Sequence, residues 1–310
     1  FVMGYLTIVM YHYVRPIRNS MFPGIKGLEL DGFVRQLDYL QENFCIIPTE
    51  EVINAVEKRT RLPNNACWLT FDDGYKDHYN YVLPELKRRK LSAAFFPPQL
   101  VASENQILDV NAVHYILSRC ENINVMVSEL NRLAISLGVN KEKIYDLETR
   151  FKKHSRFDNA QTIYFKRLLQ HALPLEVRKE IINILFSQYV GSDKSQISKN
   201  LYMSKFEISE LLKNGMFVGS HGTNHVWLDR LDEFEQQEEI YNSLQFLEEV
   251  GAERKNWIIC YPYGGYNETT LSVARKYGAC LGVTTEARAA NIFNDIPLAL
   301  PRFDTNDFPQ

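Results

Sequence analysis

The feature of the sequence that most constrains the fold is a short apolar run that ends in two aspartates and a glycine. Residues 67–71 read as a buried strand, Asp72 and Asp73 follow it, and Gly74 marks its end. Because successive side chains of an extended segment point to opposite faces, one carboxylate could hold a cation while its neighbour handles a proton. The alternative is a turn or helix N-cap, in which an aspartate accepts backbone N–H bonds.

Two histidines four residues apart follow a second strand-like run. His221 and His225 lie in the stretch Val-Gly-Ser-His-Gly-Thr-Asn-His at 218–225. On a helical turn such a pair projects from one face, and neutral imidazole is the commonest metal ligand. With one carboxylate it supplies two nitrogens and an oxygen, a set that zinc and related ions accept while leaving positions open for water and substrate. A pair of surface or capping histidines is the simpler alternative.

A third apolar run, residues 258–261, breaks into Pro262, Tyr263 and two glycines. The pattern predicts a strand followed by a rigid loop. Such a loop can present a backbone N–H to an oxyanion, which acyl transfer requires. An ordinary strand-to-helix turn would read the same way.

Taken together, the three stretches resemble the motifs of the polysaccharide deacetylases, the NodB-homology group or carbohydrate esterase family 4. Thr-Phe-Asp-Asp-Gly matches the first motif, His-Gly-Thr-Asn-His is a relaxed form of the second, and Tyr-Pro-Tyr-Gly fits the third. Met-Tyr-His-Tyr at 10–13 and Leu-Pro-Arg-Phe-Asp at 300–304 resemble the first-strand and last-strand segments of the branch that acts on exopolysaccharides. The resemblance covers residues 4–100 and 200–305.

The resemblance implies a role for each matching residue. It assigns a divalent ion to Asp73, His221 and His225, with zinc as the first choice and cobalt, nickel or iron compatible with the same ligands. It makes Asp72 the catalytic base. It also makes the N–H of Tyr263 the donor to the oxyanion and the guanidinium of Arg302 the cation that orients Asp72.

Two departures from the family pattern affect this assignment. Cys260 stands where the third motif usually has arginine, and no histidine follows His225 to serve as the general acid of the final motif. We expect Arg302 to replace the missing guanidinium beside Asp72. The acid is unassigned, and His12 is the best local candidate, although a histidine at a strand end is more often structural.

Strands and helices alternate along residues 1–104 and 201–310, which predicts a parallel α/β arrangement with the site at the carboxyl ends of the strands. The family implies a distorted (β/α) barrel with fewer than eight full repeats. Residues 105–200 instead show amphipathic helical patterns, as at 175–189, and predict a helical insert. This insert contains 14 Lys and Arg against 10 Asp and Glu. It is either a solvated helical face or a lid that recognises an anionic sugar carrier, such as a nucleotide or a lipid-linked phosphate.

Composition limits the partners and the compartment. A net charge of −3 gives no reason to expect nucleic acid as a partner. The five cysteines are odd in number and form no Cys-x-x-Cys pair, which favours a reducing compartment, the cytoplasm, with attachment at the membrane surface open. Residues 1–10 are too short to span a bilayer. The chain opens at Phe1 without an initiator Met, so a removed leader also stays open.

These observations predict a metal-dependent hydrolase that removes an N-acetyl or other N-acyl group from an amino sugar. The substrate would be a cell-surface polysaccharide or its carrier-linked precursor. Two alternatives stay open: an amidase or deformylase acting on a small non-sugar amide, and a barrel that binds glycan without hydrolysing it. Cys260 and the absent final histidine support the second alternative. Against it, keeping two adjacent buried carboxylates is costly for a protein without catalytic use for them.

Overall fold

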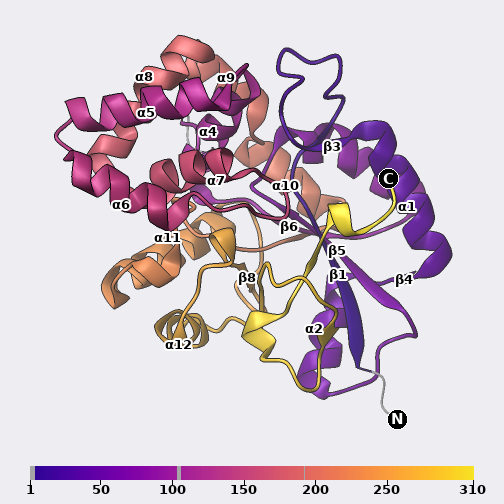
Figure 1. The fold of residues 1–310 in the computed structure, drawn as a ribbon. Helices are drawn as coiled ribbons and strands as arrows, with labels where there is room; N and C mark the ends of the chain where they lie inside the picture. Colours follow the sequence, from indigo (N-terminus) through magenta and orange to yellow (C-terminus); the bar gives the residue numbers. More distant parts are fainter. Residues whose placement is uncertain (1–3, 103–105, 192) are drawn as a thin grey trace. The chain divides into compact units, whose positions relative to one another are not determined.

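The computed structural model describes residues 4–102, 106–191 and 193–310 (Figure 1). Contacts between residues divide the chain into two compact units. The barrel unit comprises Phe1–Pro16, Gly27–Gln106 and Ser195–Gln310, and the helical unit comprises Ile17–Lys26 and Ile107–Lys194. The domain limits expected near residues 104 and 201 stay a prediction, and the short segment Ile17–Lys26 groups with the helical unit although it lies far from it in sequence.

Parallel strands form the centre of the barrel unit, which confirms the predicted α/β class. The long strands β1 (Tyr5–Tyr11) and β5 (Ala66–Asp72) pair in parallel from Thr7 with Cys67 to Tyr11 with Phe71. The seven-stranded sheet runs in the order β10–β1–β5–β6–β7, with β11 on β1 and β4 on β5. Its shorter strands are β4 (Cys45–Ile46), β6 (Ala94–Phe96), β7 (Phe217–Val218), β10 (Ala290–Asn291) and β11 (Phe303–Asp304).

Two isolated bridges connect this sheet to a second parallel pair, β8 (Ile258–Cys260) and β9 (Leu281–Val283). Ser220 bridges to Ile259 beyond the end of β7, and Val283 bridges to Leu300 shortly before β11. Since β11 returns to β1, the strand neighbours make a circuit in which two links are single bridges. The arrangement is consistent with the distorted barrel that the motifs imply.

Alternation along the strands separates the apolar side chains of the barrel unit into two clusters. Val9, Leu69 and Phe71 belong to a cluster that includes the apolar faces of the helices. Ile8 and Trp68, which point the other way, belong to a second cluster, joined by residues of β6, β8 and β9. Asp72 lies four residues after Trp68 and therefore on the same face of β5. Its side chain lies at the carboxyl end of the strand, on the face of the second cluster.

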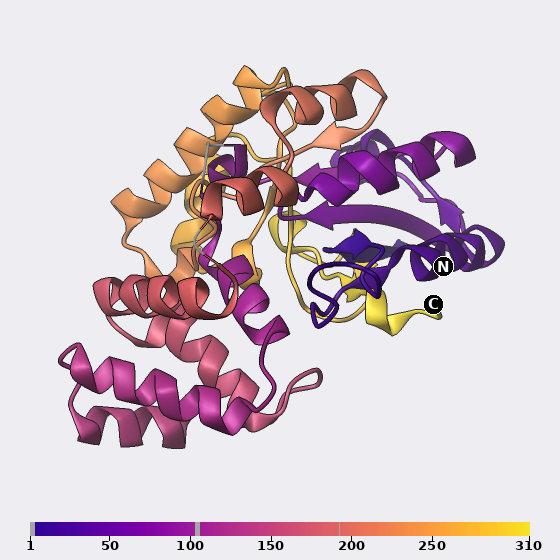
Figure 2. The same cartoon turned by 90° about the horizontal axis from the view of Figure 1, so that it is seen from above.

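Helices surround the strands of the barrel unit (Figures 1 and 2). Apolar periodicity predicts helices at 31–42, 204–213, 231–250 and 269–277, and each range overlaps an observed helix that begins within two residues of the expected start. Capping boxes at Ser204 and Asp232 explain two of these starts. The helices are α1 (Leu30–Asn43), α2 (Thr49–Lys58), α3 (Leu83–Arg89), α9 (Lys194–Leu201), α10 (Lys205–Lys213), α11 (Glu233–Glu249) and α12 (Glu268–Lys276), with α9 beginning at the unit boundary.

Shorter elements connect these helices and strands. A π-helical turn, η1 (His78–Val82), leads directly into α3, and β2 (Val14–Arg15) pairs with β3 (Leu28–Glu29). The remaining turns are 3₁₀ segments: η2 (Gln99–Ala102), η4 (Leu228–Arg230), η5 (Pro262–Gly264), η6 (Pro297–Ala299) and η7 (Thr305–Asp307).

The described part of the helical unit contains helices and no strand. Asparagine side chains cap three of the helices at residues 122, 140 and 159 by accepting backbone N–H bonds. The helix expected at 175–189 is present with these limits, although Leu175 at its start is 48% exposed. Its elements are α4 (Asp109–Ser118), α5 (Ile123–Ser136), α6 (Lys141–Phe151), α7 (Ala160–Arg167), the π-helical turn η3 (Leu168–Ala172) and α8 (Leu175–Tyr189).

Among the described residues, none of the helices has the length and apolar character needed to cross a membrane. All five cysteines are free thiols, and Cys67 and Cys260 are buried within strands β5 and β8.

Candidate metal and acid–base site

The two aspartates of the first motif lie at the end of β5. Asp72 is the last strand residue, and Asp73 adopts a left-handed conformation with φ 72°. The expectation that strand alternation separates the two carboxylates is therefore wrong for Asp73, because a backbone turn and not the pleat sets its direction. Gly74 continues the turn at φ 67°, and a Cβ there would lie 2.8 Å from Pro97. Glycine is needed for both reasons.

Arg302 holds Asp72 with two parallel hydrogen bonds. Nη1 donates to Oδ1 over 2.8 Å and Nη2 donates to Oδ2 over 2.7 Å, and the side chains are 0% and 2% exposed. Burial alone would raise the pKa of Asp72, but the charge and hydrogen bonds of Arg302 outweigh it and lower the pKa to about 2. The carboxylate is therefore ionised at neutral pH.

The guanidinium is itself fixed in place by three further contacts. Nε donates to the carbonyl oxygen of Thr284 over 2.8 Å, Nη1 to Thr70 Oγ1 over 3.0 Å, and Nη2 to Cys260 Sγ over 3.2 Å. Arg302 thus lies beside the residue that stands where the third motif usually has arginine. Arg302 contacts Asp72, as expected from the sequence, and its catalytic role stays a prediction.

The two histidines of the second motif converge on Asp73. Nε2 of His221 lies 3.2 Å from Asp73 Oδ1, and Nε2 of His225 lies 3.1 Å from the same oxygen. The helical turn expected for this pair is wrong, because the segment is a loop in which Gly222 has φ 72° and His225 has φ 53°. Left-handed residues reverse the chain tightly, and this brings the two rings together.

Glu239 holds the loop between the two histidines and was not identified from the sequence. Its Oε2 accepts the backbone N–H groups of Thr223 over 2.9 Å and Asn224 over 3.0 Å, and its Oε1 accepts the Asn224 side-chain amide. The glutamate is buried in α11 beside Ile240, with Gln236 and Ser243 also buried on this helix. A carboxylate on the apolar face of an amphipathic helix is the signal that could have indicated it.

The donor set fits a divalent cation. Asp73 Oδ1 is buried without a hydrogen bond, while Oδ2 accepts the hydroxyl of Tyr75 over 2.7 Å. His221 Nδ1 lies 2.7 Å from the carbonyl oxygen of Cys260, which can only accept, so Nδ1 carries the proton and the neutral ring offers Nε2 as a lone pair. The ligand atoms of Asp73, His221 and His225 all lie within 4.8 Å of one another.

A second grouping of Asp72, His221 and Cys260 also meets this distance. Both oxygens of Asp72 are already paired with Arg302, and burial raises the pKa of the Cys260 thiol and keeps it protonated. A metal ligand must be deprotonated and free to turn its lone pair toward the ion. The Asp73 set therefore fits a cation better.

The pKa values of the two histidines move in opposite directions. Burial disfavours both charged rings, and it lowers the pKa of His225. For His221, contacts with Cys260 and Asp73 outweigh burial and raise the pKa well above its usual range. In the absence of an ion, a proton on His221 Nε2 can thus take the place of a cation beside Asp73 Oδ1.

Tyr263 of the third motif forms part of an aromatic wall beside the histidines. Its ring stacks on Trp227 at 4.8 Å with an interplanar angle of 5°, and meets the edge of His225 at 4.7 Å. The residue has φ 58°, and Gly264 follows at φ 72°, where a Cβ would overlap Thr285 Oγ1. The backbone is sharply turned here, and the oxyanion role of the Tyr263 N–H stays a prediction.

His12 lies at the edge of the same site. Its Nε2 is 3.9 Å from Asp72 Oδ2, and its side chain is 40% exposed. The buried ring of His78 donates from Nε2 to the backbone carbonyl of His12 over 2.9 Å, and burial lowers the pKa of His78 to about 4, which keeps that ring neutral. His12 is thus open to solvent beside the candidate base.

Known proteins resemble this chain in sequence and in fold. Residues 59–121 and 177–281, more than half of the chain, match the family model described as polysaccharide deacetylase. Over 90 residues the chain is 34% identical to the Bacillus subtilis (strain 168) protein YxkH, whose name includes the words polysaccharide deacetylase. This match covers 29% of the present chain and 32% of YxkH, so the chain spans about a third of that relative.

Two solved structures share the fold over nearly the full length. The Streptococcus pyogenes deacetylase PplD is 19% identical with a TM-score of 0.60, and the match covers 97% of this chain and 92% of PplD. IcaB from Ammonifex degensii is 19% identical with a TM-score of 0.56 over the same shares. The matched region includes most of residues 105–200, which the motif resemblance does not reach. These findings confirm the predicted fold and enzyme class, and the chain belongs to the polysaccharide deacetylase family of hydrolases.

Proposed function

We propose that the protein removes an N-acyl group, in the first instance acetyl, from an amino sugar of a cell-surface polysaccharide or of its carrier-linked precursor. One observation carries this proposal. A buried oxygen of Asp73 without a hydrogen bond faces two imidazole nitrogens, and a second buried carboxylate, that of Asp72, is kept ionised by Arg302 directly beside it. This arrangement supplies a cation site and a base next to each other, as amide hydrolysis needs.

Asp73, His221 and His225 would hold the divalent ion, with zinc as our first choice. When bound, such an ion polarises the acyl oxygen and acidifies the attacking water, which a base of low pKa requires. Asp72 accepts the proton of this water, since each of its oxygens keeps a lone pair beyond the one that Arg302 uses. Arg302 orients the carboxylate and keeps it ionised.

Three further groups act on the substrate in this proposal. The backbone N–H of Tyr263 donates to the developing oxyanion, and the Trp227 ring, which stacks on Tyr263, packs against the sugar ring. His12 donates the proton that the leaving amine requires, because it is partly exposed and lies 3.9 Å from Asp72. It takes the place of the histidine that the final family motif would supply.

Charge and cysteine content support the proposed substrate class and compartment. The helical unit carries a surplus of basic residues, which favours a sugar linked to a nucleotide or lipid phosphate over a finished polymer. The five free cysteines favour a reducing setting, so we place the reaction in the cytoplasm or at its membrane surface. Neither nucleic acid nor insertion in the bilayer is part of the proposal.

The test is the release of acetate or formate from a panel of N-acylated amino sugars, offered free, nucleotide-linked, lipid-phosphate-linked and polymeric. The protein is stripped of metal and then reloaded with zinc, cobalt, nickel or iron. We expect metal-dependent release from one class of sugar. Asp72→Asn is the matched control, because it should bind the ion and release no acid.

Other outcomes of this test would favour a different function for the protein. Release from simple amides but from none of the sugars would favour the amidase or deformylase alternative. Stoichiometric metal binding and measurable glycan binding without release of acid would make the protein a glycan-binding barrel and refute the proposed hydrolysis.

A further inference from the structure

The helical unit contains a cavity of its own, separate from the residues of the candidate site. Its volume is about 280 Å³. The walls come from the segment Ile17–Lys26, from α4 and the residues that follow it, and from α7 with the loop that precedes it. Gly24 lets the segment approach α4 closely, because a Cβ there would overlap the carbonyl oxygen of Ser118.

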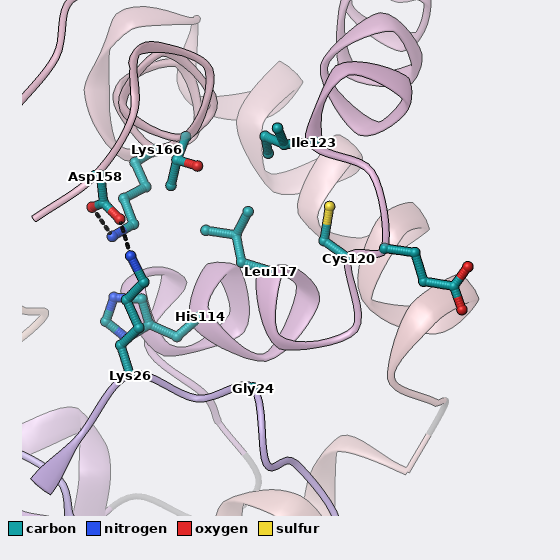
Figure 3. A pocket seen from close by; sticks show the side chains of 10 residues that line it. Gly24, Lys26, His114, Leu117, Cys120, Ile123, Asp158 and Lys166 are labelled. Atoms are coloured by element: carbon teal, nitrogen blue, oxygen red, sulfur yellow. Dashed lines mark hydrogen bonds and ion pairs between the residues drawn. The ribbon is translucent and has the colours of Figure 1, made fainter.

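One end of the cavity holds two lysines that share a single carboxylate (Figure 3). Lys26 Nζ lies 2.7 Å from Asp158 Oδ1, and Lys166 Nζ lies 2.6 Å from Asp158 Oδ2. The side chains of Asp158 and Lys166 are only 7% and 18% exposed, whereas that of Lys26 is 71% exposed. Two ammonium groups and one carboxylate leave one positive charge uncompensated in a partly buried wall.

The other lining groups do not neutralise this charge. Glu121 is exposed to solvent, so its charge is screened. Leu117 and Ile123 lie between the charged end and Cys120 (Figure 3), which gives the middle of the cavity an apolar surface. Lysine binds phosphate as a point charge, while planar recognition of a carboxylate by two bonds is the property of arginine, and no arginine is among the described lining residues.

We propose that this cavity binds a small phosphorylated molecule, with its phosphate between Lys26 and Lys166 and its body along Leu117 and Ile123. The volume is close to the lower limit of ligand pockets, about 300 Å³, so it suits a sugar phosphate or polyol phosphate better than a complete sugar nucleotide. The inference rests on the helical unit alone and holds whether or not the barrel unit hydrolyses an amide.

The test measures binding of inorganic phosphate and of glycerol phosphate to the full-length, metal-free chain by titration calorimetry at low ionic strength. We expect Lys166→Met to weaken phosphate binding at least fivefold. Lys152→Met is the matched control, because Lys152 is also a partly exposed lysine of the helical unit, pairs with Glu148 at 3.4 Å and does not line the cavity. It should bind phosphate like the unmodified chain.

Asp158→Asn separates this proposal from a structural ion pair. If the lysines receive phosphate, removal of the competing carboxylate should strengthen binding several-fold in a chain that still unfolds cooperatively. Weaker phosphate binding in folded Asp158→Asn would overturn the proposal. It would equally be overturned by absence of phosphate binding, or by binding that Lys166→Met leaves unchanged, as phosphate at the histidine site would do.

Discussion

Replacing Arg302 by methionine should remove the cation that keeps Asp72 ionised and leave a buried carboxylate alone. The two hydrogen bonds of 2.8 and 2.7 Å and the exposures of 0% and 2% make this a buried pair, for which loss of one partner costs about 3–5 kcal/mol. With Arg302 present, the pKa of Asp72 is about 2 against an ordinary value of 3.8, and each unit of pKa corresponds to about 1.4 kcal/mol. Without it, burial dominates and the pKa should rise above 3.8.

The direction of this change in the pKa of Asp72 predicts how the stability of the variant depends on pH. In the unmodified chain the lowered pKa of Asp72 contributes stability above about pH 4, which is lost as the pH falls through about 2. In Arg302→Met the ionised form is the unfavourable one, so the free energy of unfolding in urea should fall most at pH 7 and less at pH 4. Asp72→Asn added to Arg302→Met should recover about 2 kcal/mol or more at pH 7.

A surface arginine provides the control. Arg288 is 43% exposed and pairs with Glu286 and Asp295. Its substitution by methionine should lower the free energy of unfolding by only about 0–1 kcal/mol. Equal losses for Arg302→Met at pH 7 and pH 4, with no recovery from Asp72→Asn, would refute the reasoning. If Arg302→Met does not fold, Arg302→Lys keeps the charge, loses the paired bonds and should show the same pH dependence in reduced form.

Three further predictions concern the cation site. Asp73→Ala and His225→Ala should each weaken zinc binding at least 100-fold by calorimetry, while Asp72→Asn, which keeps all three ligands, should bind as before; unchanged affinity in Asp73→Ala would contradict the ligand assignment. Glu239→Gln removes the charge and turns an amide NH2 toward the donating side-chain amide of Asn224, so it should cost about 1–3 kcal/mol of stability and weaken zinc binding by about tenfold; lowered stability with unaltered affinity would reduce Glu239 to a structural role. Because the pKa of His221 is raised, zinc must displace its proton, so affinity should fall with decreasing pH, and calorimetry in buffers of different ionisation heat should detect about one proton released.

The sequence was sufficient to predict that three distant motifs meet. Each motif follows an apolar run, and the carboxyl ends of parallel strands lie at one edge of a barrel, so Asp72, His221 and Tyr263 had to lie near one another. Burial of β5 on both faces was readable in the same way, since all seven of its residues are buried. The apolar periodicity and the parallel order of the strands were therefore sufficient to predict which motifs meet at the site.

The local geometry of the site could not be read from the sequence. The left-handed conformations of Asp73 and His225 are unusual for residues other than glycine and are imposed by tertiary contacts, such as the bond from the Asp73 N–H to the Phe96 carbonyl over 3.1 Å. The grouping of Ile17–Lys26 with the helical unit likewise rests on tertiary contacts, such as those of Gly24 with Ser118 and of Phe22 with Tyr115, and no periodicity in either segment indicates them.

The exchange between Cys260 and Arg302 shows what the site requires physically. A carboxylate that is 2% exposed needs a cation in direct contact, and the position in the chain from which the cation comes is immaterial to that need. A thiol occupies little space, and its sulfur lies 3.2 Å from the guanidinium that reaches in from the segment before β11. An arginine at position 260 would place a second guanidinium against the first. The small residue in the third motif and the arginine in the last strand segment are therefore best understood as one linked choice, so that Cys260→Arg should be tolerated only together with a neutral residue at position 302.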